Sequence, residues 1–169
     1  MTYLLQARST TRDVWVRHHH DGQFVRGPWK LPDGTDIYDL IANGDTARLG
    51  FVPRFVRDNR GTRVGDLLWT TGMCKIASRR FIDVLESIDA TGYRTFPVDV
   101  LNRDSSSLGD FVGFAVIDGD PAYDLRFSNG FQTFRCRASD RVVDALRTAE
   151  VTDLSIEAAS SLPSTDRTA

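Results

Sequence analysis

The strongest constraint on the fold of this chain is an internal repeat in its second half. When the sequence is shifted by 61 residues, Ala77-Ser78-x-Arg80-x-x-Asp83-x-Leu85 coincides with Ala138-Ser139-x-Arg141-x-x-Asp144-x-Leu146, and Thr91 coincides with Thr152. These six identities in fifteen positions lie at expected capping and core sites of two helices. Helical patterning alone does not require the matching Arg and Asp positions. We therefore favour a duplicated strand–helix–strand unit over independent convergence on good capping.

Local patterns predict the elements around the repeat. Ser78 and Ser139 are good N-caps, because a serine oxygen can accept a bond from an N–H of the first helical turn. Apolar residues follow each serine at helical spacing. Segments 94–101, 111–117 and 131–137 read as strands, and 111–117 is apolar on both faces, as a central strand would be. In the first half, 2–7 and 14–17 are strand candidates, 36–42 is a short helix, and 49–56 with 64–69 suggest a hairpin.

These patterns predict an α+β fold, a mostly antiparallel sheet with two or three helices packed on it. We expect three regions along the chain: a β-rich, irregular part over 1–65, an α+β part with the two related helices over 66–158, and a disordered tail over 159–169. The tail contains serine, threonine and proline without periodic apolar residues, a composition typical of disorder.

Composition excludes several classes of protein. With 41% hydrophobic and 26% charged residues the chain is globular, and it has no apolar run near the ~20 residues that a membrane helix needs. The first residues have no basic segment followed by a long apolar one, so we expect no secretory signal. Two cysteines, Cys74 and Cys136, are too few for a disulfide framework or a zinc finger. A cytoplasmic location is the simplest expectation.

Catalytic motifs are missing, so we predict no catalytic residues, no cofactor and no metal. The sequence contains no G-x-S-x-G, H-E-x-x-H, P-loop or G-x-G-x-x-G motif. Cys74 is interpreted as a small buried residue, with a reactive thiol as the alternative. His18 and His20 would share one face of a strand, but a stable metal site needs further ligands. An enzyme built around Cys74 or His18–His20 stays open as an alternative.

Two charged clusters are candidate binding features. Arg54, Arg57, Arg60 and Arg63 recur every third residue, and this patch would serve a nucleic-acid-associated regulatory module. It lacks the interleaved aromatic residues of a single-strand binder, and a soluble hairpin tip explains it as well, so we do not favour nucleic acid as the partner. Asp33, Asp36, Asp39 and Asp45 lie within thirteen residues, without the spacing of an EF-hand.

One stretch of the chain resembles a known family. The segments Asp66-Leu67-Leu68-Trp69, Ser78-Arg79-Arg80-Phe81-Ile82-Asp83-Val84-Leu85-Glu86 and Thr91-Gly92-Tyr93-Arg94-Thr95-Phe96-Pro97-Val98 are similar to the immunity-protein family of bacterial polymorphic toxin systems, the group named after a myxobacterial immunity protein. The ending Val151-Thr152-Asp153-Leu154-Ser155-Ile156 also fits, and the resemblance covers about residues 49–158. It implies a non-enzymatic protein that binds and neutralises a cognate toxin protein.

The resemblance covers mainly scaffold positions, so we expect partner specificity to lie in the first 48 residues. There, Trp29 is followed by Asp33, Asp36 and Asp39, with glycine and proline breaks that favour exposed loops. Tryptophan beside a charged rim is typical of binding hot spots. We therefore predict that Trp29, Asp33, Asp36 and Asp39 contact the partner; burial of Trp29 in the core is the alternative.

Overall fold

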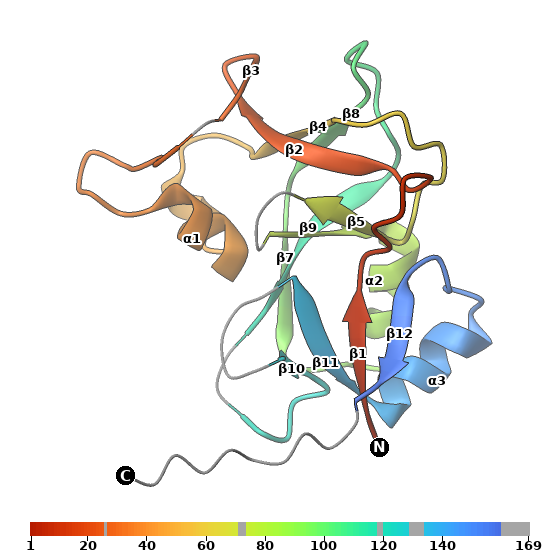
Figure 1. Ribbon diagram of the computed structural model, residues 1–169. Coiled ribbons are helices and arrows are strands. Elements are labelled where there is room, and N and C mark those ends of the chain that lie inside the picture. The colour runs from red at the N-terminus through yellow and green to blue at the C-terminus, as the bar shows by residue number, and fades with distance from the viewer. Residues whose placement is uncertain (26, 71–73, 118–119, 129–133, 160–169) are drawn as a thin grey trace, which may run out of the picture.

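The computed structural model describes residues 1–25, 27–70, 74–117, 120–128 and 134–159. It confirms the predicted α+β class (Figure 1). The helices are α1 (Ile37–Asn43), α2 (Arg79–Ser87) and α3 (Asp140–Thr148), with a 3₁₀ turn over Thr46–Arg48. The strands are β1 (Thr2–Gln6), β2 (Trp15–His20), β3 (Gln23–Phe24), β4 (Arg54–Arg57), β5 (Leu67–Thr70), β6 (Lys75–Ser78), β7 (Tyr93–Phe96), β8 (Asp99–Leu101), β9 (Phe111–Val116), β10 (Leu125–Phe127), β11 (Arg135–Ser139) and β12 (Ser155–Ala158).

The strands form two sheets. The larger sheet has the order β7-β9-β6-β5-β2-β4-β8, with β3 paired to β2, and the smaller has the order β10-β11-β1-β12. Most neighbours are antiparallel, and the described parallel pairs are β2 with β5 and β4 with β8. β9 lies between β6 and β7, as its apolar sequence on both faces predicted.

The sequence repeat is a structural repeat. The order β5-β6-β9-β7 of the first unit recurs as β10-β11-β1-β12 in the second, where the N-terminal strand β1 takes the place that β9 has in the first. The strands also pair in the same register, because residues 61 positions apart have equivalent partners. Equivalent pairs are Leu67↔Ala77 with Leu125↔Ala138, Lys75↔Phe114 with Cys136↔Leu5, and Thr95↔Phe114 with Ile156↔Leu5.

Each unit begins its helix with the same polar arrangement. Ser78 Oγ accepts a bond from the N–H of Phe81 at 3.2 Å and donates to Asp66 at 2.7 Å. Arg80 binds both oxygens of the same Asp66 carboxylate, at 2.6 and 2.9 Å. The shared serine and arginine of the repeat therefore orient one buried carboxylate at the start of the helix.

The second unit has the same arrangement, formed by Ser139, Arg141 and Asp124. Ser139 Oγ accepts from the N–H of Val142 at 3.4 Å and donates to Asp124 at 2.8 Å, and Arg141 binds Asp124 at 2.6 Å. These bonds hold the pKa of Asp124 at about 2, although partial burial of the carboxyl opposes them. The repeated Asp83 and Asp144 have no shared role, since they pair with different arginines, Arg79 and Arg147.

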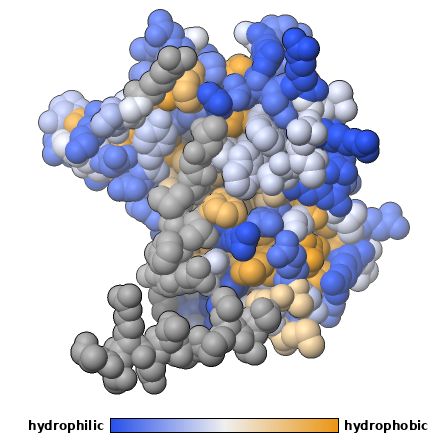
Figure 2. Space-filling view, viewed as in Figure 1, coloured by the Kyte–Doolittle hydropathy of each residue, from blue (hydrophilic) through white to orange (hydrophobic). Residues whose placement is uncertain are grey.

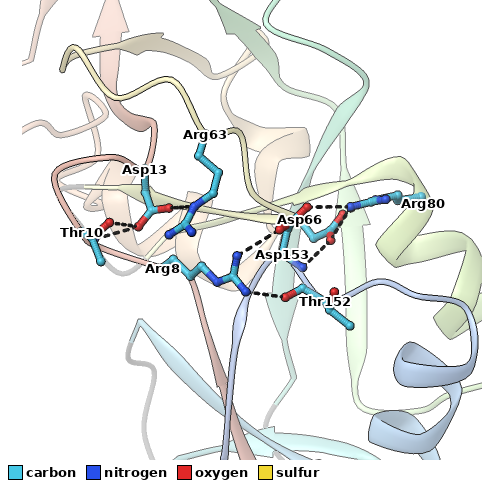
Figure 3. Close-up of polar contacts among 8 residues, drawn as sticks. All are labelled: Arg8, Thr10, Asp13, Arg63, Asp66, Arg80, Thr152 and Asp153. Carbon is cyan, nitrogen blue, oxygen red and sulfur yellow. Dashed lines mark hydrogen bonds and ion pairs between the residues drawn. The ribbon is translucent and has the colours of Figure 1, made fainter.

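The two units also hold each other. Asp66 accepts a bond from the backbone N–H of Asp153, after α3, and Asp124 accepts one from Thr91, after α2, both at 3.1 Å. Each carboxylate thus anchors the turn that follows the other unit's helix. Figure 3 shows this junction for Asp66 and Arg80, with Arg8 bound to Asp153 beside them at 3.0 Å.

Two apolar cores lie on opposite faces of the larger sheet. Under α2 and α3 the core includes Leu85, Phe114 and Leu146, while α1 covers a second core that includes Ile41 and Ile76. Figure 1 shows α1 on one side of the strands, and α2 and α3 on the other. Because both faces of β6 and β9 are buried, successive residues of these strands enter different cores.

Two strand predictions are wrong. Segments 49–56 and 64–69 do not form a hairpin, because β2 lies between β4 and β5 and pairs with both. The side chain of Asn59 helps to hold this arrangement, because it accepts from the N–H of Trp15 at 3.0 Å and donates to the carbonyl of Asp13 at 2.6 Å. Segment 94–101 is two strands, since β7 pairs with β9 whereas β8 pairs with β4. Pro97 separates them, as expected of a residue that cannot donate to a ladder.

Strand pairing crosses the expected boundary between residues 65 and 66. β1 belongs to the smaller sheet with β10, β11 and β12, while β2, β3 and β4 extend the larger sheet that β5 and β6 share. Most of the expected disordered tail, residues 160–169, lies outside the described residues.

Candidate partner-binding surface

Trp29 lies at the centre of a group of aromatic rings beside α1. Its ring contacts His18 edge-on at a centroid distance of 4.7 Å, His20 at 4.9 Å, and Tyr38 at 5.9 Å, and it stacks on Phe51 at 5.5 Å. We call these five residues the aromatic cluster. Trp29 and Phe51 are each only partly buried against the core under α1. The rings of Trp29 and Phe51 therefore keep part of their surface accessible while they rest on a packed support.

A short closed loop presents Trp29. Its carbonyl accepts a bond from the N–H of Ile37 at 2.9 Å, and Lys30 and Asp36 form an isolated bridge just inside it. Within this frame Leu31 and Thr35 are joined by a bond of 2.9 Å from the N–H of Leu31 to the Thr35 carbonyl. The loop is thus held at its base by the first turn of α1, and Trp29 has a defined position.

The structure gives the three predicted aspartates different roles. Asp36 is the N-cap of α1 and accepts a bond from the N–H of Tyr38 at 2.8 Å. Asp33 accepts from Thr35 at 2.9 Å, which lowers its pKa, and forms an exposed ion pair with Arg48 at 2.7 Å. Asp39 is exposed in the first turn of α1. Asp33 and Asp39 are therefore accessible, whereas the carboxylate of Asp36 is committed to the helix.

His18 is the buried member of the aromatic cluster. Its side chain stacks on Phe55 at 4.9 Å with an angle of 12° between the rings, and the residue is 4% exposed. Neither ring nitrogen has a hydrogen-bond partner among the described residues. Burial, assisted by the charges of His20 and His19, lowers the pKa of His18 to about 4. The ring is therefore neutral and acts as an aromatic packing group.

Sequence reasoning found only part of the aromatic cluster. Alternation along a strand correctly placed His18 and His20 on one face, because both rings contact Trp29. It did not include Tyr38 and Phe51. Tyr38 lies two residues after Asp36, the N-cap of α1. Its position in the first turn of the helix was the only sequence feature that could have placed it near Trp29. Phe51 follows the 3₁₀ turn, and no periodic pattern places it.

The cysteines are unsuited to nucleophilic chemistry. Cys74 is 6% exposed and precedes β6 rather than a helix, and burial raises the pKa of its thiol to about 12. Cys136 is 1% exposed, and burial raises its pKa to about 11. Both thiols are therefore protonated at neutral pH. Within the described ranges, no three histidine, cysteine or acidic residues gather as metal ligands would.

The four arginines between Arg54 and Arg63 do not form one patch. Arg54 pairs with Asp99 at 3.2 Å, and Arg63 pairs at 2.6 Å with Asp13, whose pKa is held at about 2 against the effect of burial. Arg54 and Arg57 are three residues apart on β4, so their side chains leave opposite faces of the sheet.

Comparison of the chain with protein-family models finds no matching family, and comparison with curated proteins finds no match. None of the helices in the described part of the chain is long and apolar enough to cross a membrane.

Proposed function

We propose that this chain is an immunity protein that binds a cognate bacterial protein toxin in the cytoplasm and neutralises it by occupying a surface the toxin needs. The observation that carries the proposal is the partly buried Trp29 within the aromatic cluster. A tryptophan held by surrounding rings loses little conformational freedom when it binds, which is why tryptophan is common at hot spots. The sequence resemblance to immunity proteins supplies the class of partner.

The charges around the aromatic cluster support a basic partner surface. Asp33 and Asp39 are exposed on the same short segment as Trp29. Asp33 is already paired with Arg48 at 2.7 Å and Lys30 is exposed beside Trp29, so the acidic charge that a partner would meet comes mainly from Asp39. Carboxylates at the rim of an interface raise the association rate for a positively charged partner and disfavour acidic ones. A toxin with a basic substrate-binding surface would meet this combination of apolar centre and acidic rim.

The proposal is tested by affinity capture from the native host with the full chain as bait, followed by mass spectrometry. Parallel baits carry Trp29→Ala and, as a matched control, Trp69→Ala, because Trp69 lies in β5 and contacts Phe134 away from the cluster. We expect one predominant partner on the parent and on the Trp69→Ala bait, and its loss on Trp29→Ala. Circular dichroism and the thermal midpoint check that each bait is folded.

A second variant tests the rim without altering the helix. Asp33→Asn with Asp39→Asn removes two exposed carboxylates, releases Arg48 from its ion pair with Asp33, and leaves the N-cap Asp36 intact. We expect a slower association rate that depends less on salt, because rim charges act mainly on the encounter. A partner that binds this variant and Trp29→Ala with unchanged affinity would place the interface elsewhere on the molecule.

A further inference from the structure

A second surface, independent of the aromatic cluster, carries positive charge that forms no ion pair among the described residues. Arg57, Arg60 and Arg103 line an open groove of about 390 Å³ together with Asn59, Asn102 and Asp104. Its lining residues come from the end of β4 and the segment after it, and from the segment that follows β8. Figure 1 shows the ends of these two strands toward the top of the molecule. Figure 2 shows hydrophilic side chains over this end. We call this feature the arginine groove.

The arginine groove keeps its positive charge because the nearest acidic residue in the sequence is paired outside the groove. Arg17 pairs with Asp58 at 2.7 Å, so the acidic residue closest in sequence to Arg57 and Arg60 is already neutralised. Three arginines and Asp104 leave the groove with a net charge of +2. Hydrogen bonds from Ser106 lower the pKa of Asp104, so its carboxylate is ionised and its charge is included in that total.

Backbone carbonyls hold two of the guanidinium groups in position. Arg103 donates from Nε to the carbonyl of Arg57 at 3.3 Å and from Nη2 to the carbonyl of Asp58. Arg57 donates from Nη2 to the carbonyl of Gly61. These bonds tie the two connecting segments together and use few of the five N–H groups that each guanidinium carries. For Arg60, no side-chain bond is found within the described residues.

The arginine groove therefore has many donors and few acceptors. The amides of its asparagines are already used, since Asn59 binds Trp15 and Asp13, and Asn102 donates to Ser106 at 3.1 Å. A compact anion that only accepts hydrogen bonds would satisfy the remaining N–H groups of these arginines. Guanidinium forks match phosphate oxygens in geometry, and a phosphate monoester carries about −1.5 to −2 charges at pH 7.

We propose that the arginine groove is a binding site for the phosphate group of a small phosphorylated ligand. The net charge of the groove matches a dianionic phosphate, and its volume lies within the range of small-molecule sites, about 300–1,000 Å³. An extended nucleic acid fits less well, because the groove contains no aromatic side chain on which bases could stack. This proposal does not rest on the aromatic cluster or on the identity of a toxin.

The test uses the full chain labelled with ¹⁵N and inorganic phosphate as the probe, followed by NMR at low salt. We expect saturable shifts confined to residues 57–61 and 102–104. Arg60→Ala should weaken binding about tenfold by removing charge-assisted bonds. Arg54→Ala is the matched control, because it removes the same charge from a side chain that is paired with Asp99. It should change the dissociation constant less than twofold.

Several outcomes would overturn the proposal. Shifts that do not saturate, or that Arg54→Ala reduces as much as Arg60→Ala, would show a diffuse electrostatic effect. A hexaglutamate peptide that binds through Arg60 where inorganic phosphate does not would assign the groove to carboxylates of a protein. Single-stranded DNA that binds more tightly, with shifts spreading beyond the groove, would assign it to nucleic acid.

Discussion

Acidification should destabilise this protein through His18 at a higher pH than the one at which Asp13 and Asp124 become protonated. The pKa of His18 is about 4 in the fold, because the ring is buried against Phe55 and Trp29, against an ordinary value of 6.5. Between pH 6.5 and about 4, His18 is therefore protonated in the unfolded chain but remains neutral in the folded chain. Stability is complete above pH 6.5 and falls as the pH drops toward 4.

The size of this effect follows from the pKa difference. A pKa difference between 6.5 and about 4 lowers the free energy of unfolding by about 3 kcal/mol when the pH is below both values. At pH 5 the loss is about 2 kcal/mol. For a domain whose total stability is about 5–15 kcal/mol, this is a large fraction. Asp13 and Asp124, with pKa values of about 2, lose their contribution only below about pH 4, so they do not interfere above pH 5.

The assay is urea unfolding from pH 7.5 to pH 5, comparing the parent with His18→Phe. Phenylalanine keeps a planar ring against Phe55 and removes the titrating group. His19, whose pKa is also lowered by burial, is present in both proteins and cancels in the comparison. We expect the parent to lose about 2 kcal/mol more than His18→Phe over this interval. Parallel stability curves for the two proteins would refute the reasoning.

The structural repeat and one of its turns give two further predictions. Leu85 and Leu146 are both fully buried at equivalent places in α2 and α3, so each Leu→Ala change should lower stability by about 2–5 kcal/mol in urea, and an unchanged midpoint for either would contradict that packing. Gly92 has a φ of +89°, and a Cβ placed there by substitution would collide with the carbonyl oxygen of Leu125. Gly92→Ala should therefore lower the free energy of unfolding by about 3 kcal/mol. Gly22→Ala, with a φ of +76° in open space, should cost only about 1 kcal/mol, and equal losses for the two variants would count against the close contact.

Features encoded over a few residues could be predicted from the sequence. The serine caps, the helical spacing after Ser78 and Ser139, and the apolar sequence of β9 depend on neighbours along the chain, and each appears in the structure. The repeat also indicated equivalent packing. It did not reveal that β1, at the start of the chain, completes the second unit, because that pairing joins distant segments.

Long-range pairing explains the failures. The hairpin expected around residues 58–61 looked plausible because two apolar segments flank a turn-forming sequence, yet β2 is inserted between those segments. The arginines at every third residue suggested one surface. Residues three apart share a face on a helix, but on a strand they lie on opposite faces. Ion pairs with Asp13 and Asp99 then remove Arg63 and Arg54 from that surface, and neither partner is near in sequence.

For the candidate site, sequence spacing indicated which residues share a segment, while their contact with a partner stays a prediction. Trp29 and the exposed Asp33 and Asp39 lie on one projecting segment, whereas Asp36 serves as a helix cap. The support of Trp29 by His18, His20 and Phe51 requires β2 and the 3₁₀ turn to converge beside α1. The spacing of residues along the sequence does not predict how close these elements lie in space.

The most direct test of the central claim is neutralisation of the captured partner in cells. The partner is expressed from an inducible promoter in a host that lacks this protein, with the parent, Trp29→Ala or Trp69→Ala supplied from a second promoter at equal soluble levels. The account predicts growth arrest by the partner alone, full growth with the parent and with Trp69→Ala, and arrest with Trp29→Ala. Arrest that the parent does not relieve, or equal relief by Trp29→Ala, would contradict it.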